Sequence, residues 1–235
     1  NFALYYELAR GKWRNILKDN ELRFYLFIVA ASIILITINI RMASIYTTTG
    51  ESLKYSLFQV SSIVTTTGYA TTDFDLWPTF SKLILFILMF IGGCAGSTGG
   101  GMKQIRVLLV FKLVKREFKK IMHPRAMIPL KMNGKAVPSD VVANVSSFFI
   151  LYIFIFIIGT AVVSLEGISM VSAASSVAAT LGNIGPGFEL VGASQNYNHF
   201  SYPIKVLLSF FMLLGRLEVF TILALISPSF WRKEY

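Results

Sequence analysis

Long apolar runs with few or no charged residues constrain the fold more than any other feature of this sequence. Residues 24–40 and 141–165 contain no charged side chain, and residues 79–91 and 202–226 are nearly as apolar. A membrane-spanning helix needs about 20 predominantly apolar residues. The whole chain is 54% hydrophobic and only 14% charged, against roughly 25% charged residues in soluble domains. We therefore predict an all-α integral membrane protein.

The basic residues lie mainly between the apolar runs. The net charge of +10 would suggest nucleic-acid binding in a soluble chain, but here it fits cytoplasmic loops that obey the positive-inside rule. We predict no nucleic-acid partner. Cys94 is the only cysteine, so neither an intrachain disulfide nor a zinc cluster is expected. The sequence opens at Asn1 without a signal peptide, and we expect it to begin within a longer protein.

Two segments between the spans are too short and too polar to cross a bilayer. Residues 51–64 are compatible with a helix and residues 65–78 are not, which predicts a re-entrant pore helix followed by an extended loop. Residues 170–180 and the Gly/Pro-rich residues 181–192 repeat this order. The chain therefore reads twice as helix, re-entrant loop and helix, with both ends cytoplasmic, which indicates two parallel repeats. We divide it into a cytoplasmic connecting segment 1–22, a repeat 23–118, a cytoplasmic linker 119–139, a repeat 140–227 and a tail 228–235.

The two re-entrant loops align without gaps. SSIVTTTGYA, residues 61–70, falls over AATLGNIGPG, residues 178–187, and this places Gly68 on Gly185. Successive backbone carbonyls can replace the hydration shell of a cation, and glycine permits the unusual dihedrals that such a backbone needs. The segment 65–69 is similar to the Thr-Val-Gly-Tyr-Gly filter of potassium channels, with Ala70 at the last position. The alternative interpretation is an ordinary Thr/Gly turn.

A glycine-rich segment, residues 92–101, interrupts the second apolar run. So many glycines cannot maintain a helix, and non-helical backbone at membrane depth must face protein or a water-filled cavity. Close helix packing through small residues is the other interpretation. A phosphate-binding loop is excluded because Gly-Lys-Ser/Thr is absent.

Ionisable residues also occur near or within the predicted spans. Arg216 and Glu218 lie inside the last span, where such groups are functional or paired with each other. Lys103 and Arg106 follow the glycine-rich segment, and they either anchor it or extend to the cytoplasmic interface. An intramembrane serine protease is not supported, because both histidines fall outside the spans and Ser97 lacks a general base. We predict no enzyme activity.

Four motifs together give the sequence a resemblance to a known family. TTTGYATTDFDLWP, GGCAGSTGGGMKQIR, LGNIGPGFE and LGRLE resemble the third and fourth repeats of TrkH-type potassium transporters in the Trk/Ktr/HKT superfamily. The resemblance covers essentially the whole chain and implies a potassium-channel-like fold with one broken membrane helix. Members of that family carry four such repeats, so the resemblance implies that two filter loops lie outside this sequence.

The resemblance also assigns residues to a selectivity filter and a gate. It implies a filter made by Thr66, Thr67, Gly68, Tyr69, Asn183, Ile184, Gly185 and Pro186. Potassium would bind at Thr66, Thr67, Asn183 and Ile184. The alternative register of the fourth loop starts from Gly182. The implied gate comprises Gly92, Gly93, Gly96, Ser97, Thr98, Gly99, Gly100, Gly101 and Arg216.

The implied function is potassium uptake through a carbonyl-lined filter controlled by the glycine-rich loop. The resemblance further implies a multi-pass protein of the bacterial inner membrane, a homodimer, no cofactor, and a cytosolic nucleotide-binding regulatory subunit of the TrkA type. The basic stretch 112–125 is the candidate surface for that partner. Sodium/potassium symport of the HKT-like kind is the alternative, and a non-conducting scaffold is a third interpretation.

Overall fold

The computed structural model describes residues 2–217 and is mostly helical. The α-helices are α1 (Phe2–Ala9), α2 (Trp13–Lys18), α3 (Asn20–Met42), α4 (Thr49–Val64), α5 (Thr79–Phe90), α6 (Gln104–Met122), α7 (Ser139–Ser164), α8 (Met170–Leu181) and α9 (Tyr202–Arg216). Three 3-10 turns lie at Phe74–Leu76, Glu189–Val191 and Tyr197–His199. Strands β1 (Lys131–Met132) and β2 (Lys135–Ala136) form one antiparallel hairpin.

Two of the described helices, α3 and α7, are long and apolar enough to cross a membrane. Helices α5 and α8 are apolar but shorter. The predicted order of a long helix, a short helix, a loop and a further helix is therefore found twice, as α3–α4–α5 and α7–α8–α9. The last predicted span is described only as far as Leu217, and Glu218 with the tail lies outside the described residues.

Helix α3 is longer than the apolar run that predicted it. It begins at Asn20 rather than at residue 24, because the Asp19 carboxylate caps it by accepting a 2.8 Å hydrogen bond from Leu22 N. Helix α4 begins with a capping box in which Thr48 and Glu51 satisfy each other's backbone N–H groups. Local capping therefore sets the start of both helices more closely than hydropathy does.

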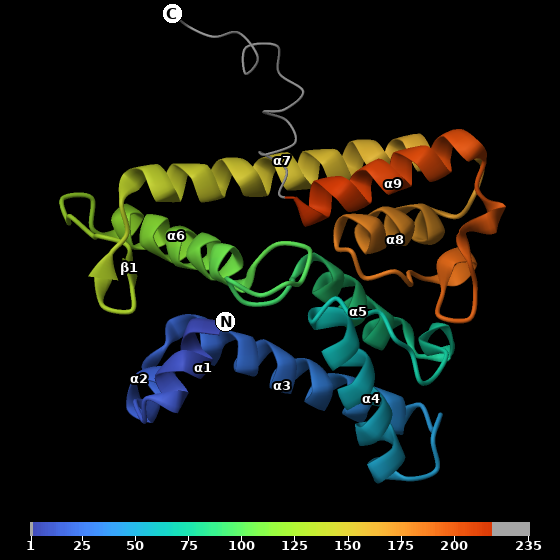
Figure 1. Cartoon of the computed structure of the whole chain (residues 1–235), viewed down its shortest axis with the longest axis horizontal. Coiled ribbons are helices and arrows are strands. Elements are labelled where there is room, and N and C mark those ends of the chain that lie inside the picture. The colour runs from blue at the N-terminus through green and yellow to red at the C-terminus, as the bar shows by residue number, and fades with distance from the viewer. Residues whose placement is uncertain (1, 218–235) are drawn as a thin grey trace, which may run out of the picture.

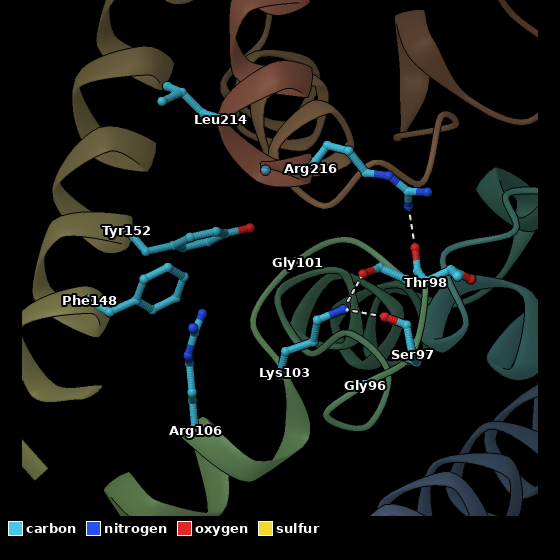
Figure 2. Close-up of a pocket in the computed structure, with 12 residues that line it drawn as sticks. Gly96, Ser97, Thr98, Gly101, Lys103, Arg106, Phe148, Tyr152, Leu214 and Arg216 are labelled. Atoms are coloured by element: carbon cyan, nitrogen blue, oxygen red, sulfur yellow. Dashed lines mark hydrogen bonds between the residues drawn. The ribbon is translucent and has the colours of Figure 1, made fainter. Parts of the chain in front are cut away.

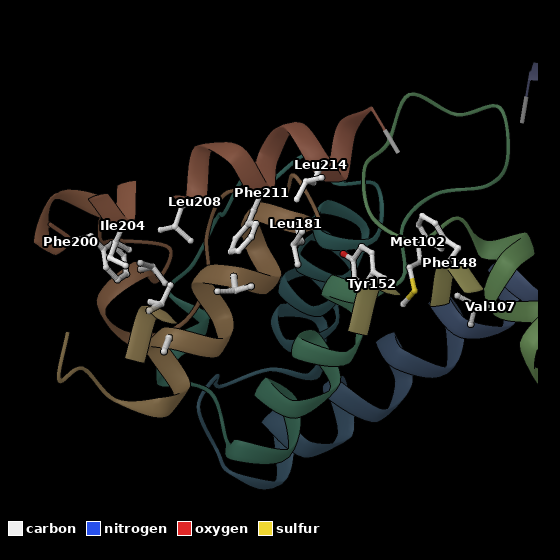
Figure 3. Close-up of a cluster of buried hydrophobic side chains, with 14 residues drawn as sticks. Met102, Val107, Phe148, Tyr152, Leu181, Phe200, Ile204, Leu208, Phe211 and Leu214 are labelled. Carbon is white, nitrogen blue, oxygen red and sulfur yellow. The ribbon is translucent and has the colours of Figure 1, made fainter. Parts of the chain in front are cut away.

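The two halves pack together through apolar side chains. One buried cluster joins α7, α8 and α9 and extends to Met102, just before α6, and to Val107 within α6, as Figure 3 shows. The second cluster lies among α3, α4 and α5 and takes in Ala178, Ile184 and Phe188 from the other half. Figure 1 shows α7 and α9 along one side of the molecule, α3 along the other, and α5 and α8 between them. This packing brings the loops after α4 and α8 together.

The linker contains a hairpin that the sequence analysis did not predict. Asn133 and Gly134 both have positive φ, 48° and 81°, which is typical of an Asn-Gly type I′ hairpin turn. Asn133 docks on the start of α3: its Nδ2 donates to Asp19 Oδ2 over 2.7 Å, and its Oδ1 accepts from Asn20 N over 2.9 Å. The linker is therefore an ordered element fastened to the first long helix.

Candidate functional site

Helices α4 and α8 each end directly at one of the two aligned loops, which we name the Thr66 loop (residues 65–70) and the Asn183 loop (residues 182–187). The carboxyl end of a helix carries a partial negative charge and favours cations. Both short helices therefore direct this end of their dipole toward the loop that follows. Most of α8 is buried, including every residue from 175 to 181, so its direction is fixed by packing.

The Thr66 loop turns its carbonyl groups away from α4. Thr66 N donates to Ile63 O over 3.0 Å, and Thr67 N and Gly68 N donate to Ser62 O over 2.9 and 3.4 Å. In a trans peptide the N–H and the preceding C=O point in opposite directions, and no cis peptide is present in the described chain. The carbonyl oxygens of Thr65, Thr66 and Thr67 therefore form a row on the side away from the helix.

The Asn183 loop repeats the first two of these bonds at equivalent positions. Asn183 N donates to Thr180 O over 3.1 Å and Ile184 N donates to Ala179 O over 2.9 Å. Asn183 and Gly185 have positive φ, 54° and 109°, as Thr66 and Gly68 do at 56° and 77°. Gly182 instead lies in the right-handed region at φ −75° as the C-cap of α8. This backbone supports the register that pairs Gly68 with Gly185.

The two loops touch each other at Gly68. A Cβ atom at this position would lie 1.8 Å from the carbonyl oxygen of Ile184 and 3.2 Å from Cδ of Pro186. Only glycine permits both this approach and the positive φ. Tyr69, which follows, is exposed over 73% of its surface, and its carbonyl oxygen accepts a 2.6 Å hydrogen bond from Ser62 Oγ.

Tyr197 supports the Asn183 loop from behind, a contact that the sequence analysis missed. Its hydroxyl donates to the carbonyl oxygen of Gly185 over 2.6 Å, and its ring packs against Phe200 at 5.8 Å between centroids. Burial raises the pKa of this phenol above its ordinary value, so the hydroxyl stays protonated and able to donate even in alkaline solution. Position 197 lies in a polar outer loop, and its residue type alone gave no signal of this role.

The glycine-rich loop, residues 92–101, is closed at its neck by backbone hydrogen bonds. Gly92 N donates to Met102 O over 2.8 Å, Met102 N to Phe90 O over 3.2 Å, and Gln104 N to Gly93 O over 3.1 Å. The predicted break in the second span is thus an ordered loop between α5 and α6. A Cβ at Gly92 would lie 2.0 Å from Gly100 O, and one at Gly93 would lie 2.7 Å from Ser97 Oγ.

This loop lies against the end of both carbonyl rows. Gly100 N donates to Thr66 Oγ1 over 3.0 Å. A Cβ at Gly99 would lie 3.6 Å from Thr65 O, and one at Gly100 would lie 2.5 Å from Gly182 O. Thr65 and Gly182 are equivalent positions in the two repeats. The loop therefore contacts the same end of each row, and its glycines are what allow the close approach.

Two cationic side chains hold the loop from its other side, as Figure 2 shows. Lys103 Nζ donates to Ser97 O over 3.1 Å and also to Gly99 O. Arg216 Nη1 donates to Thr98 O. Lys103 therefore anchors the loop rather than extending to the interface. The backbone carbonyls make these contacts, whereas Ser97 Oγ is buried without a partner among the described residues.

A cavity of about 390 Å³ lies between this side of the loop and α6, α7 and α9. Gly96, Gly101, Arg106 and Tyr152 contribute to its lining, together with Lys103 and Arg216. The Arg106 guanidinium lies 4.1 Å from the ring centroid of Phe148, a cation–π geometry. Gly96 and Gly101 have positive φ, 72° and 66°. The cavity carries a positive electrostatic potential from its three basic side chains.

Carboxylates gather at the opposite end of the carbonyl rows. Asp75 Oδ2 accepts a 3.0 Å hydrogen bond from Glu189 N, and Asp73 Oδ2 accepts one of 2.9 Å from Ser194 Oγ. Desolvation raises the pKa of Asp75, and the nearby negative charges of Asp73 and Glu189 add to this effect. These two hydrogen bonds join the loop after α4 to the segment after α8.

Comparison with known proteins independently supports the family resemblance. The family described as "TrkH: Cation transport protein" matches residues 15–233. The Trk system potassium uptake protein TrkH of Salmonella typhimurium is 38% identical over 234 residues, which cover 99% of this chain and 48% of that protein. TrkH of Vibrio parahaemolyticus is 41% identical over 215 residues, 92% of this chain and 44% of that protein. TrkG of Escherichia coli K12 is 36% identical over 233 residues, 99% of this chain and 47% of that protein.

The fold agrees with these matches. The crystal structure of the potassium transporter TrkH from Vibrio parahaemolyticus superposes with a TM-score of 0.88 at 39% identity, covering 99% of this chain and 50% of that one. The chain spans about half the length of the relatives that it matches. Those relatives are transport proteins rather than enzymes, and the chain is an integral membrane protein of the bacterial inner membrane. A family match over nearly the whole sequence shows that the chain belongs to the TrkH family of cation transport proteins.

Proposed function

We propose that the chain supplies half of a gated potassium-uptake pore. The observation that carries this proposal is the pair of carbonyl rows at equivalent positions of the two repeats, both closed at the same end by the glycine-rich loop. The Salmonella relative is named a potassium uptake protein, which favours potassium as the transported ion. Two further loops, from the part of the protein outside this sequence, complete the ring of carbonyls.

The filter proposal assigns a role to each loop. Carbonyl oxygens of Thr66, Thr67, Asn183 and Ile184 replace the water around a dehydrated potassium ion. The negative helix ends of α4 and α8 stabilise the ion electrostatically. Gly68 and Gly185 hold the backbone in the left-handed region, while Tyr69 and Pro186 complete the two loops.

The gate proposal follows from the place of the glycine-rich loop. The loop contacts the same end of both rows, and in this proposal it blocks the path of an ion there. Arg216 holds it there and places a positive charge beneath the filter, which opposes cation entry. Conduction then requires the loop to move, and its glycines lower the resistance of the backbone to such a change.

The assembly around this pore is also a proposal. Homologues named for a Trk system support a regulatory partner of the TrkA type, and the basic stretch 112–125, which begins in α6, is the candidate docking face. A homodimer remains a prediction from the family resemblance. Both are tested by purification of the full-length protein with and without the candidate partner.

Rubidium uptake into proteoliposomes that contain the full-length protein tests the filter, with sodium as competitor. A Gly68→Ser variant brings a side chain into the 1.8 Å approach to Ile184 O. We expect uptake to fall at least tenfold and selectivity over sodium to weaken. Gly167→Ser is the matched control, since Gly167 has a similar φ of 74° with no atom within 4 Å of its Cβ position.

The outcome separates the alternatives. Unchanged, selective uptake in Gly68→Ser contradicts the filter assignment. Sodium-dependent rubidium uptake by the unmodified protein indicates symport of the HKT-like kind. A folded full-length protein without any flux under opening conditions indicates a scaffold.

A further inference from the structure

A buried carboxylate at the start of α3 contacts the glycine-rich loop from a distant part of the sequence. Glu21 Oε1 accepts a 2.6 Å hydrogen bond from Ala95 N, across 74 residues of chain. Glu21 is 4% exposed. A charged acceptor makes a strong hydrogen bond, and leaving it buried without that donor is unfavourable. The contact therefore ties the position of the loop to the position of α3.

Ala95 lies in a tight turn of the loop. Ser97 N donates to Cys94 O over 3.0 Å, and Gly96 has a φ of 72°. This combination is typical of a type II turn with Ala95 at its second position. The Glu21 carboxylate thus holds this turn through Ala95 N, whereas Lys103 and Arg216 hold the carbonyl groups of the residues that follow it.

The end of α3 that carries Glu21 is itself fastened to the cytoplasmic hairpin. The Asp19 carboxylate caps α3 through Leu22 N and accepts from Asn133 Nδ2 over 2.7 Å. The hairpin is held in turn by Lys112 Nζ of α6, which donates to Lys131 O over 2.9 Å. A short series of hydrogen bonds therefore leads from the hairpin to the loop.

We propose that Glu21 is a positioning residue that holds the glycine-rich loop in its blocking conformation. The two hydrogen bonds from Asn133 to Asp19 and Asn20 keep the start of α3, which carries Glu21, in place. The inference rests on the proposed gating function. A partner that displaces the hairpin on the cytoplasmic side shifts the start of α3, withdraws the Glu21 carboxylate from Ala95 and releases the loop. The hairpin therefore provides a mechanical route from a regulatory surface to the gate.

The loop can be observed directly through Cys94, the residue before Ala95, which is buried at 8% exposure. We expect Glu21→Ala in the full-length protein to speed labelling of Cys94 by a water-soluble maleimide about tenfold, the factor expected for loss of a charge-assisted hydrogen bond. Peptide mass spectrometry reads the label at this residue. Basal rubidium flux should rise in parallel.

Two further variants distinguish positioning from charge and from misfolding. Removing a nearby negative charge can by itself change thiol reactivity, but Glu21→Gln removes the charge and keeps an acceptor, so its labelling rate should lie much closer to that of the unmodified protein than to that of Glu21→Ala. Ala95→Pro removes the donor and keeps Glu21, and proline is favoured at this position of the turn, so it should label like Glu21→Ala. Glu117→Ala, at an exposed residue of α6, is the carboxylate control.

The labelling rate of Cys94 tests the role of the Glu21–Ala95 hydrogen bond whether or not the pore conducts potassium. Fast labelling of Glu21→Gln, or slow labelling of Ala95→Pro, overturns the proposal. Asn133→Ala should speed labelling by a smaller factor than Glu21→Ala does, and it should add no further increase in the double variant. If the double variant instead labels faster by the product of the two single factors, the coupling of the hairpin to the loop is contradicted. Absent rubidium flux in every protein, including the unmodified one, contradicts the proposed function alone.

Discussion

Replacement of Gly100 by alanine should open the proposed pore, because the added methyl group would clash with the Asn183 loop and push the glycine-rich loop away from it. The new Cβ would lie 2.5 Å from Gly182 O and 2.8 Å from Asn183 Cβ. Both neighbours belong to the Asn183 loop, and the first is backbone that cannot rotate away. Gly100 has no positive φ, so alanine fits its backbone and the whole effect comes from the contact between the two loops.

The size of the effect follows from this contact. The loop must retreat by about 0.9 Å to restore ordinary van der Waals separation. Overpacking of this kind typically costs about 1–3 kcal/mol. Because the strain exists only while the loop is closed, it shifts the closed–open equilibrium by roughly 5- to 150-fold toward the open state.

Rubidium flux through the full-length protein in proteoliposomes, measured under conditions that keep the gate closed, checks this prediction. Gly99→Ala is the neighbouring control, because the nearest atom to its Cβ would be the Thr66 hydroxyl at 3.2 Å, while the nearest backbone atoms would lie at 3.6 Å, an ordinary contact distance. We expect it to change flux by about twofold at most. The reasoning is refuted if folded Gly100→Ala conducts no better than the unmodified protein, or if Gly99→Ala opens it equally. Loss of selectivity would show that the Asn183 loop had moved instead.

Three other predictions follow from single contacts. Tyr197→Phe keeps the ring but removes the donor to Gly185 O, so selectivity for rubidium over sodium should fall about fivefold, the value of one neutral hydrogen bond; an unchanged permeability ratio contradicts a supporting role. Arg216→Gln should raise basal flux about tenfold because the guanidinium no longer holds Thr98 O, and flux at or below that of the unmodified protein would count against the gate. Burial raises the pKa of Asp75, so the folded protein holds that proton more tightly than the unfolded chain does. The stability gained is complete below the ordinary aspartate pKa, about 3.9, and is lost as pH rises through the higher folded pKa. The melting temperature of Asp75→Asn relative to the unmodified protein should therefore increase from pH 4 to pH 7, and a constant difference would refute the shift.

Much of the site could be predicted because it depends on local sequence. The charge-free runs, the short helices before each loop and the glycine-rich break all have signals within a window of about 20 residues. The gap-free alignment of Gly68 with Gly185 is matched by the dihedrals of both loops. Two local signals were not used: Asp19 is a typical N-cap residue, and Asn133-Gly134 is a typical hairpin turn.

The contacts that fasten the glycine-rich loop could not be predicted in the same way. Glu21 pairs with Ala95 across 74 residues and Arg216 with Thr98 across 118. Each acceptor or donor on the loop is a backbone group, which every residue type provides. No composition or spacing therefore identifies the partner.

The sequence by itself determined that the chain belongs in a membrane, where its short helices and loops interrupt the long apolar runs, and which glycines are free to adopt a left-handed backbone, because hydropathy and glycine dihedrals act on each segment locally. Only the tertiary structure decided that Thr65 and Gly182 meet the same glycine-rich loop, and that Glu21, Lys103 and Arg216 hold it from different sides. Those contacts arise from the packing of α3, α5, α6 and α9 against one another, and packing joins residues that the chain keeps far apart.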